Sequence, residues 1–231
     1  MPDSPRRRFS VPDDIAYLAP MLVFLALVWG GTNWKNLYPH FYVARALIVP
    51  ILLIILWPHY TKIRWNGWWL GLILGVLGIV QWIALQLLLQ KISIHGWMPF
   101  KPSPDAFNPT TSFSSPTMMW TWIVIRIASA SLVVPVMEEL FWRDFLWRQI
   151  IAPADFKLAE VGEKNWPAFW IVAFAFATVH GNWCLTAVVW GILIGGLLLR
   201  TKSLGACMIM HGTSNLLLAL YVLHTHDWTF W

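Results

Sequence analysis

Residues 68–90 read WWLGLILGVLGIVQWIALQLLLQ, a run without a single Asp, Glu, Lys or Arg. The hydrocarbon core of a bilayer is about 30 Å thick, and an α-helix crosses it in about 20 residues. This run therefore predicts a transmembrane helix. Comparable apolar runs lie around it, at about 15–31, 41–58, 118–151, 166–181, 183–200 and 203–224. We predict an all-α integral membrane protein with about seven transmembrane helices forming a bundle.

The composition of the chain also indicates a membrane protein. Hydrophobic residues make up 58% of the 231 residues and charged residues only 12%, whereas soluble domains carry about 25% charged residues. The chain contains 18 Trp residues, and Trp side chains favour the bilayer interface. The net charge of +5 comes from basic residues between the apolar runs, so we assign it to membrane topology and expect no nucleic-acid partner.

The distribution of Lys and Arg predicts how the chain is oriented. Cytoplasmic segments of membrane proteins are enriched in basic residues. With a cytoplasmic N-terminus, the inner segments hold Arg6, Arg7, Arg8, Lys62, Arg64, Arg143, Arg148, Lys157, Lys164, Arg200 and Lys202, and the outer segments hold Lys35, Lys91 and Lys101. We therefore expect a multi-pass protein of the cell (inner) membrane, with an uncleaved first helix and the N-terminus in the cytoplasm.

Ionisable residues inside a span mark a candidate functional site, because lipid disfavours them by at least about 2.5 kcal/mol each. Glu138 and Glu139 are adjacent within the fourth apolar run. Glu139 lies four residues before Arg143, so the two share a helix face and can pair. Glu138 is left without an obvious partner, and a buried carboxylate of this kind is a candidate general base.

Two later runs carry further polar residues. His180 ends the fifth run, four residues after Phe176, and His211 lies four residues before Asn215 in the seventh run. Each of these residues alone could serve as an interhelical hydrogen bond. Together they predict a polar cavity within the membrane, and a carboxylate, two imidazoles and an amide suffice for hydrolysis by an activated water.

These residues form three short motifs on separate apolar runs. The motifs are Glu138-Glu139-xxx-Arg143, Phe176-xxx-His180 and His211-xxx-Asn215. In this order they resemble the signature of the CPBP (CAAX protease and bacteriocin-processing, Abi) intramembrane proteases, which include the CAAX prenyl endopeptidases. The resemblance covers about residues 118–224. Within that family, the chain is most similar to the CAAX prenyl protease-related proteins of exosortase-type systems.

The resemblance implies an intramembrane endopeptidase, a hydrolase that acts on peptide bonds. It implies that Glu138 and His180 activate a water, and that His211 and Asn215 stabilise the oxyanion. The supporting residues would be Glu139, Arg143 and Phe176. The implied substrate is a membrane-anchored or lipidated protein or peptide, and components of an exosortase-type system are candidate partners.

Three of these residues could also bind a metal ion. Glu138, His180 and His211 are ligand types that suit zinc or another divalent metal. The chain lacks an HExxH helix, however, and the two histidines come from separate runs. We therefore expect hydrolysis without a bound metal or other cofactor.

The motifs also suggest a division of the chain. Residues 1–116 would form an N-terminal three-helix membrane region with a linker, and residues 117–231 a CPBP-like catalytic helical core, within one structural unit. All catalytic groups must share one depth in the bilayer. We therefore expect the fourth crossing to use about 127–150, with 118–126 as a lead-in turn and a kink at Pro135.

Two other functions stay open. The chain could be a non-enzymatic membrane scaffold or sorting partner on the same fold, since a fold does not by itself establish an activity. It could also be a proton-coupled transporter that uses Glu138, Glu139 and the histidines as a relay. Transporters tend to contain inverted repeats, and the sequence shows no evident internal repeat.

Overall fold

A computed structural model describes residues 12–92 and 106–231 of the chain. Within these residues the chain is helical and contains no strand, which confirms the all-α prediction. Arg6, Arg7, Arg8 and Lys101, which enter the predicted orientation, lie outside the described residues. So do residues 93–105, which form half of the linker predicted between the third and fourth runs.

Among the described residues, six helical segments are long and apolar enough to cross a bilayer. They are α1 (Asp13–Asn33), α2 (Tyr38–Ile55), α3 (Trp68–Ile92), the continuous helix Pro116–Ile151, α9 (Cys184–Thr201) and α10 (Leu204–Thr225). The seventh predicted span corresponds to α8 (Trp166–Thr178), which is apolar but has 13 residues. At 1.5 Å per residue it reaches only about 20 Å, less than the thickness of the bilayer core.

The continuous helix Pro116–Ile151 carries the first motif. It comprises α5 (Pro116–Ala128), a π-helical segment η3 (Ser129–Val133), α6 (Val134–Glu139), a second π-helical segment η4 (Leu140–Leu146) and α7 (Trp147–Ile151). The predicted lead-in turn at 118–126 is wrong, because these residues are α-helical. A π-helical segment, η3, ends two residues before Pro135, where the kink was predicted.

This helix is longer than a single crossing requires. Its 36 residues extend over about 54 Å, so Glu138 lies well inside the helix although many residues precede it. The short α8 ends at Thr178, and His180 follows two residues after this C-terminal end. The predicted catalytic residues therefore come from one long helix, from the end of one short helix and from α10.

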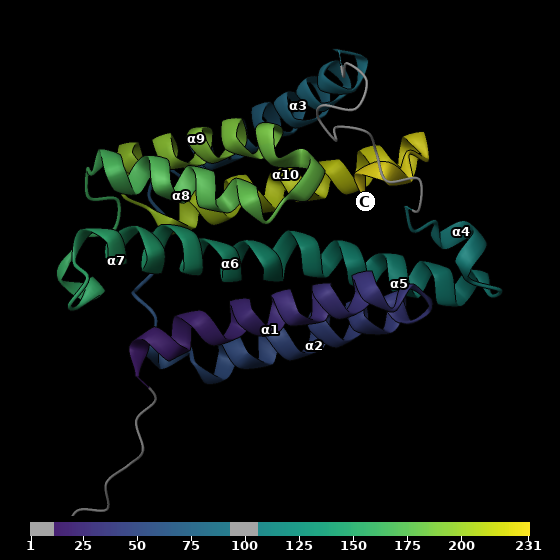
Figure 1. Ribbon diagram of the computed structural model, residues 1–231, viewed down its shortest axis with the longest axis horizontal. Coiled ribbons are helices and arrows are strands. Elements are labelled where there is room, and N and C mark those ends of the chain that lie inside the picture. The colour runs from purple at the N-terminus through teal and green to yellow at the C-terminus, as the bar shows by residue number, and fades with distance from the viewer. Residues whose placement is uncertain (1–11, 93–105) are drawn as a thin grey trace, which may run out of the picture.

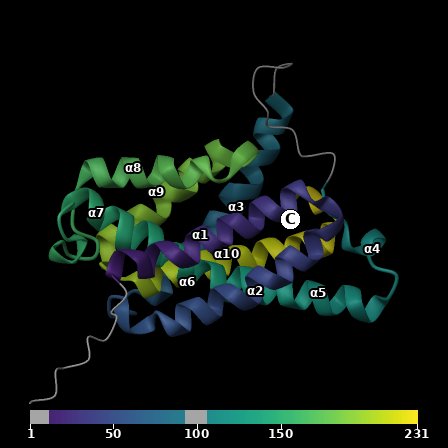
Figure 2. The same cartoon turned by 60° about the horizontal axis from the view of Figure 1, so that its bottom comes forward.

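The continuous helix lies between two layers of helices. On one face it contacts α1 and α2, which run side by side, and on the other it contacts α8 and α10 (Figures 1 and 2). Helix α3 packs against α10 and α9. The start of α1 and the C-terminus lie at opposite ends of the bundle (Figure 1).

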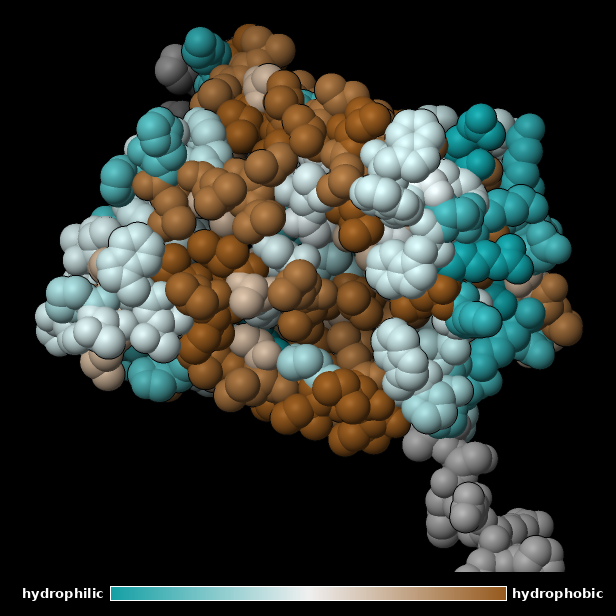
Figure 3. Space-filling view, turned by 180° about the vertical axis from the view of Figure 1, so that it is seen from behind, coloured by the Kyte–Doolittle hydropathy of each residue, from teal (hydrophilic) through white to brown (hydrophobic). Residues whose placement is uncertain are grey.

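The outer surface of the bundle is apolar around its middle. Figure 3 shows a belt of hydrophobic side chains between two ends where hydrophilic side chains gather. Large apolar side chains such as Ile54, Leu132 and Val124 are 71%, 69% and 61% exposed. A soluble protein rarely exposes a continuous apolar surface of this kind, so lipid is the expected environment.

A row of glycines brings α3 close to α10. Gly71 and Gly75 are four residues apart on one face of α3, the spacing at which small residues let transmembrane helices approach. A Cβ atom on Gly71 would lie 2.4 Å from the carbonyl oxygen of Ala206, and one on Gly75 would lie 2.7 Å from Cβ of Thr213. This close contact positions α10, which carries His211 and Asn215.

We expect Gly71→Val to destabilise the protein by about 1–3 kcal/mol or more, because the added atoms meet the backbone of α10. Unfolding in mixed detergent micelles measures this loss. Gly196→Val in α9 is the matched control, since a Cβ atom there meets nothing within 4 Å. Equal stability of the two variants would show that the α3–α10 contact does not depend on the glycine.

Candidate active site

The first motif forms a buried ion pair that reaches the third motif. The Arg143 guanidinium donates from Nη1 to Oε1 of Glu139 at 3.1 Å. The same carboxylate oxygen lies 2.8 Å from Nδ1 of His211 in α10. Arg143 and Glu139 are 1% and 0% exposed. The structure therefore joins the pair predicted from the i,i+4 spacing to a histidine 72 residues away.

The contact with Glu139 determines the hydrogen-bonding state of His211. A carboxylate only accepts hydrogen bonds, so Nδ1 of His211 must donate. In the neutral ring, Nε2 is then the unprotonated nitrogen. This arrangement fixes the ring and leaves Nε2 available to another group.

His180 has the same arrangement at the end of α8. Its Nδ1 lies 2.7 Å from the carbonyl oxygen of Phe176, one turn earlier, and this nitrogen must donate because the carbonyl accepts. The imidazole packs against the rings of Phe176 and Trp82, with centroid distances of 4.3 and 5.7 Å. As in His211, the Nε2 atom is left for a ligand or a water.

Phe176 lies at the centre of these groups. The Arg143 guanidinium carbon lies 4.7 Å from its ring centroid, and Trp190 stacks on it at 5.3 Å. The aromatic ring thereby contacts Arg143 and His180 together, and its side chain is 1% exposed. Its position accounts for the supporting role that the motif pattern implies.

Three of the four predicted catalytic residues line one cavity of about 190 Å³. They are His180, His211 and Asn215, and Ser214 adds a hydroxyl to the lining. Trp82, Trp190 and Phe176 supply aromatic walls. The cavity therefore combines apolar walls with polar groups from the second and third motifs.

Glu138, the fourth predicted catalytic residue, is not among the residues that line this cavity. Its side chain is 7% exposed, and Oε2 has no hydrogen-bond partner among the described residues. The charges of Glu139, Arg143 and His211 act on it electrostatically. Glu138 is thus a buried carboxylate beside the ion pair, in the place expected from its offset on the helix.

Asn215 contacts the π-helical segment η3. Val134 donates its N–H to the carbonyl of Ser129, which is the i→i−5 hydrogen bond of a π-helix. By the same pattern, the carbonyl of Ala130 would accept a hydrogen bond from the N–H of residue 135. Pro135 has no N–H to donate. The side-chain amide of Asn215 supplies the missing donor, with Nδ2 2.8 Å from the carbonyl oxygen of Ala130. One hydrogen of Nδ2 is therefore used in this contact, and the other can reach the cavity.

Sequence reasoning identified Phe176 but not the other two aromatic walls of the cavity, Trp82 and Trp190, nor a second buried ion pair. Asp144 and Arg148 pair across one turn, as Glu139 and Arg143 do, and the hydroxyl of Tyr17 donates to Asp144 at 2.8 Å. The same i,i+4 spacing would have revealed this pair. The Trp residues carried no comparable signal, since a chain rich in Trp gives no reason to select two of them.

Whether the site could bind a metal ion depends on how its candidate ligand side chains are arranged. Among the described residues, no group of three His, Cys, Asp or Glu side chains is arranged to hold a metal ion. Glu138, His180 and His211, the ligands considered from the sequence, therefore do not form a ready site. Hydrolysis without a metal stays a prediction.

Comparison with known proteins finds one family to which part of the chain is similar. The family model described as type II CAAX prenyl endopeptidase Rce1-like matches residues 120–217. This range runs from within α5 to within α10 and includes all three motifs. No curated protein and no solved structure matches the chain. Residues 120–217 are therefore similar to the type II CAAX prenyl endopeptidases, the resemblance that the motifs had indicated.

Proposed function

We propose that the protein is an intramembrane endopeptidase that hydrolyses a peptide bond of a membrane-anchored or lipidated protein or peptide. The observation that carries the proposal is the shared orientation of His180 and His211. Each imidazole is held through Nδ1, and both rings line one cavity inside the apolar bundle. Two fixed imidazoles, an amide and a neighbouring carboxylate are suited to acyl transfer to water.

In the proposed mechanism, Nε2 of His180 accepts a hydrogen bond from a water and orients it. The Glu138 carboxylate accepts the proton of this water as its oxygen attacks the scissile carbonyl carbon. The carbonyl becomes a tetrahedral oxyanion. The C–N bond then breaks, the accepted proton passes to the leaving nitrogen, and a carboxylic acid and an amine result. Because Glu138 does not line the cavity, the mechanism requires its carboxylate to reach the water once the substrate is bound.

The oxyanion would be held by His211 and Asn215. His211 already donates from Nδ1 to Glu139, so it must carry a second proton to donate from Nε2 as well. The buried Glu139 carboxylate stabilises such an imidazolium. Asn215 donates one hydrogen to Ala130 and offers the other. In this proposal Glu139 and Arg143 are positioning residues.

The cavity lies within the bundle, so the substrate must reach it at membrane depth. A membrane-anchored or lipidated peptide satisfies that requirement, and no metal takes part in the proposed steps. We place the protein in the cell (inner) membrane with its N-terminus in the cytoplasm. Components of an exosortase-type system are proposed as partners.

The test is cleavage of a panel of lipidated and transmembrane peptides by the purified protein, with its metal content measured in parallel. We expect cleavage without stoichiometric metal, and about 10²-fold slower cleavage by His180→Gln, because the substitution removes the imidazole that orients the water. Cleavage that rises and falls with bound zinc would contradict the mechanism. A wild-type protein that cleaves nothing while it still binds partner proteins would favour the scaffold function.

A further inference from the structure

A second cavity, of about 350 Å³, lies at the end of the bundle where α1 begins. Its lining residues come from residues 61–64 before α3, residues 157–161 before α8 and residues 202–204 at the start of α10, together with Arg148 of α7 (Trp147–Ile151). Its basic lining residues are Lys62, Arg64, Arg148, Lys157 and Lys202. Of the described residues that line it, one is acidic, Glu160. The cavity therefore concentrates positive charge.

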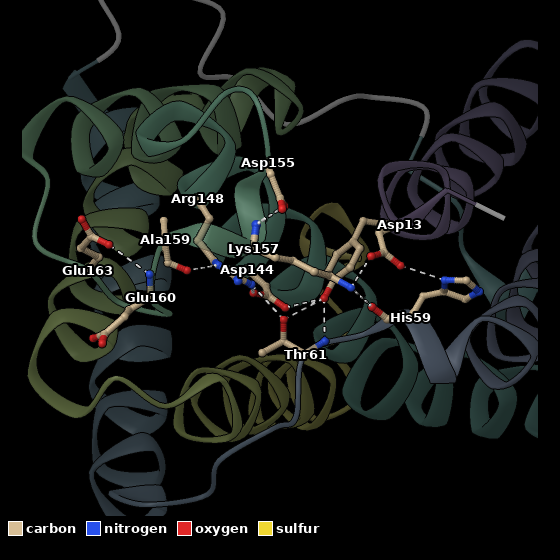
Figure 4. Close-up of polar contacts among 11 residues, drawn as sticks. Asp13, His59, Thr61, Asp144, Arg148, Asp155, Lys157, Ala159, Glu160 and Glu163 are labelled. Atoms are coloured by element: carbon tan, nitrogen blue, oxygen red, sulfur yellow. Dashed lines mark hydrogen bonds and ion pairs between the residues drawn. The ribbon is translucent and has the colours of Figure 1, made fainter. Parts of the chain in front are cut away.

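Some of this charge is neutralised within the protein. Lys157 lies 2.5 Å from the carboxylate of Asp13, and Lys202 lies 3.2 Å from that of Glu160. Arg148 pairs with Asp144 (Figure 4). By contrast, Lys62 and Arg64 pair with no carboxylate of the described chain, and both are exposed at the cavity.

Hydrogen bonds hold the floor of the cavity, which Arg148 and Thr61 form. Arg148 is 4% exposed, donates from Nε to the Ala159 carbonyl at 2.8 Å and from Nη1 to the Thr61 hydroxyl at 2.8 Å. The backbone N–H of Thr61 donates to the Tyr17 hydroxyl at 2.7 Å. Figure 4 shows how these contacts join α1, the 61–64 connection and the 157–161 connection. A preorganised floor lowers the entropic cost of binding.

Exposed Trp side chains near the cavity indicate that it faces the bilayer interface. Trp65 and Trp166, in or beside two of its connections, are 52% and 53% exposed, and exposed Trp side chains favour the headgroup region. Leu158 lines the cavity and is 78% exposed. An apolar side chain beside unpaired cations suits a ligand with a charged head and an apolar tail.

We propose that this cavity binds a phosphate-bearing anion, presented at this depth as the headgroup of an anionic phospholipid. Lys62 and Arg64 supply the uncompensated charge, Arg148 and Thr61 form the floor, and Leu158 contacts the start of the acyl chains. Basic pockets between transmembrane helices bind anionic headgroups in this way. No residue lines both this cavity and the cavity of His180 and His211. Lipid binding here therefore does not depend on the proposed protease activity.

The test is native mass spectrometry of the purified full chain titrated with phosphatidylglycerol or phosphatidylcholine. We expect saturable binding of one phosphatidylglycerol, and about 30-fold weaker binding by Lys62→Gln/Arg64→Gln, since two surface cations are removed. Both side chains are exposed and unpaired, so the variant should fold normally. Equal binding of phosphatidylcholine would overturn the proposal.

The matched control is Lys164→Gln/Arg200→Gln. It removes the same charge from exposed residues that do not line the cavity, and it should keep near wild-type affinity. An equal loss in both double variants would show a general surface potential and overturn the proposal. Titration with inorganic phosphate distinguishes the sources of the anion. Displacement of the lipid by equimolar phosphate would assign the cavity to a soluble ion and overturn the headgroup assignment.

Discussion

Replacing Glu138 by Gln should lower kcat/KM for peptide cleavage by about 10³- to 10⁴-fold, the upper range for loss of a general base. The amide has nearly the same shape as the carboxylate and cannot accept the proton of the attacking water. Stability should change little, because Oε2 of Glu138 has no hydrogen-bond partner among the described residues. A neutral side chain also avoids burying a charge.

The separation of activity from stability is what makes this variant informative. Initial cleavage rates and unfolding in the same detergent measure the two quantities. Glu160→Gln is the control, since it makes the same chemical change at an exposed residue and should leave cleavage unchanged. A Glu138→Gln protein that cleaves at the wild-type rate would exclude Glu138 as the base.

Much of the fold could be predicted from the sequence because hydropathy and helix length are local properties. The run at 68–90 appears as α3 (Trp68–Ile92). The lead-in turn predicted at 118–126 was wrong. It was inferred from the requirement that the catalytic groups of all three motifs lie at one depth in the bilayer, which is not a local property of the sequence. The structure has instead the continuous helix Pro116–Ile151 and the short α8.

The candidate site was only partly predictable for a related reason. The i,i+4 spacing of Glu139 and Arg143 predicts their contact, since both residues lie on one helix. The bond from His211 to Glu139 joins helices far apart in the chain, and no local pattern contains it. The bond from Asn215 to Ala130 depends on a π register, which the position of Pro135 suggests but does not specify.

Replacing Glu139 by Gln should destabilise the protein by about 3–5 kcal/mol, the range found when one partner of a buried ion pair is removed. Arg143 is 1% exposed, so its charge would remain buried without the carboxylate that it contacts. The Gln side chain keeps an oxygen that can accept from Nδ1 of His211. The variant therefore tests the charge of Glu139 more than the shape of the site. SDS titration in mixed micelles measures the free energy of unfolding.

The double variant Glu139→Gln/Arg143→Met separates the ion pair from a general packing defect. If the single variant is unstable because a guanidinium is left uncompensated, removing that guanidinium should recover part of the lost stability. Glu160→Gln, in an exposed pair with Lys202, should lose at most about 1 kcal/mol. A double variant as unstable as the sum of the single variants would show that Glu139 and Arg143 act independently, and that the charge on Glu139 is retained for His211 alone.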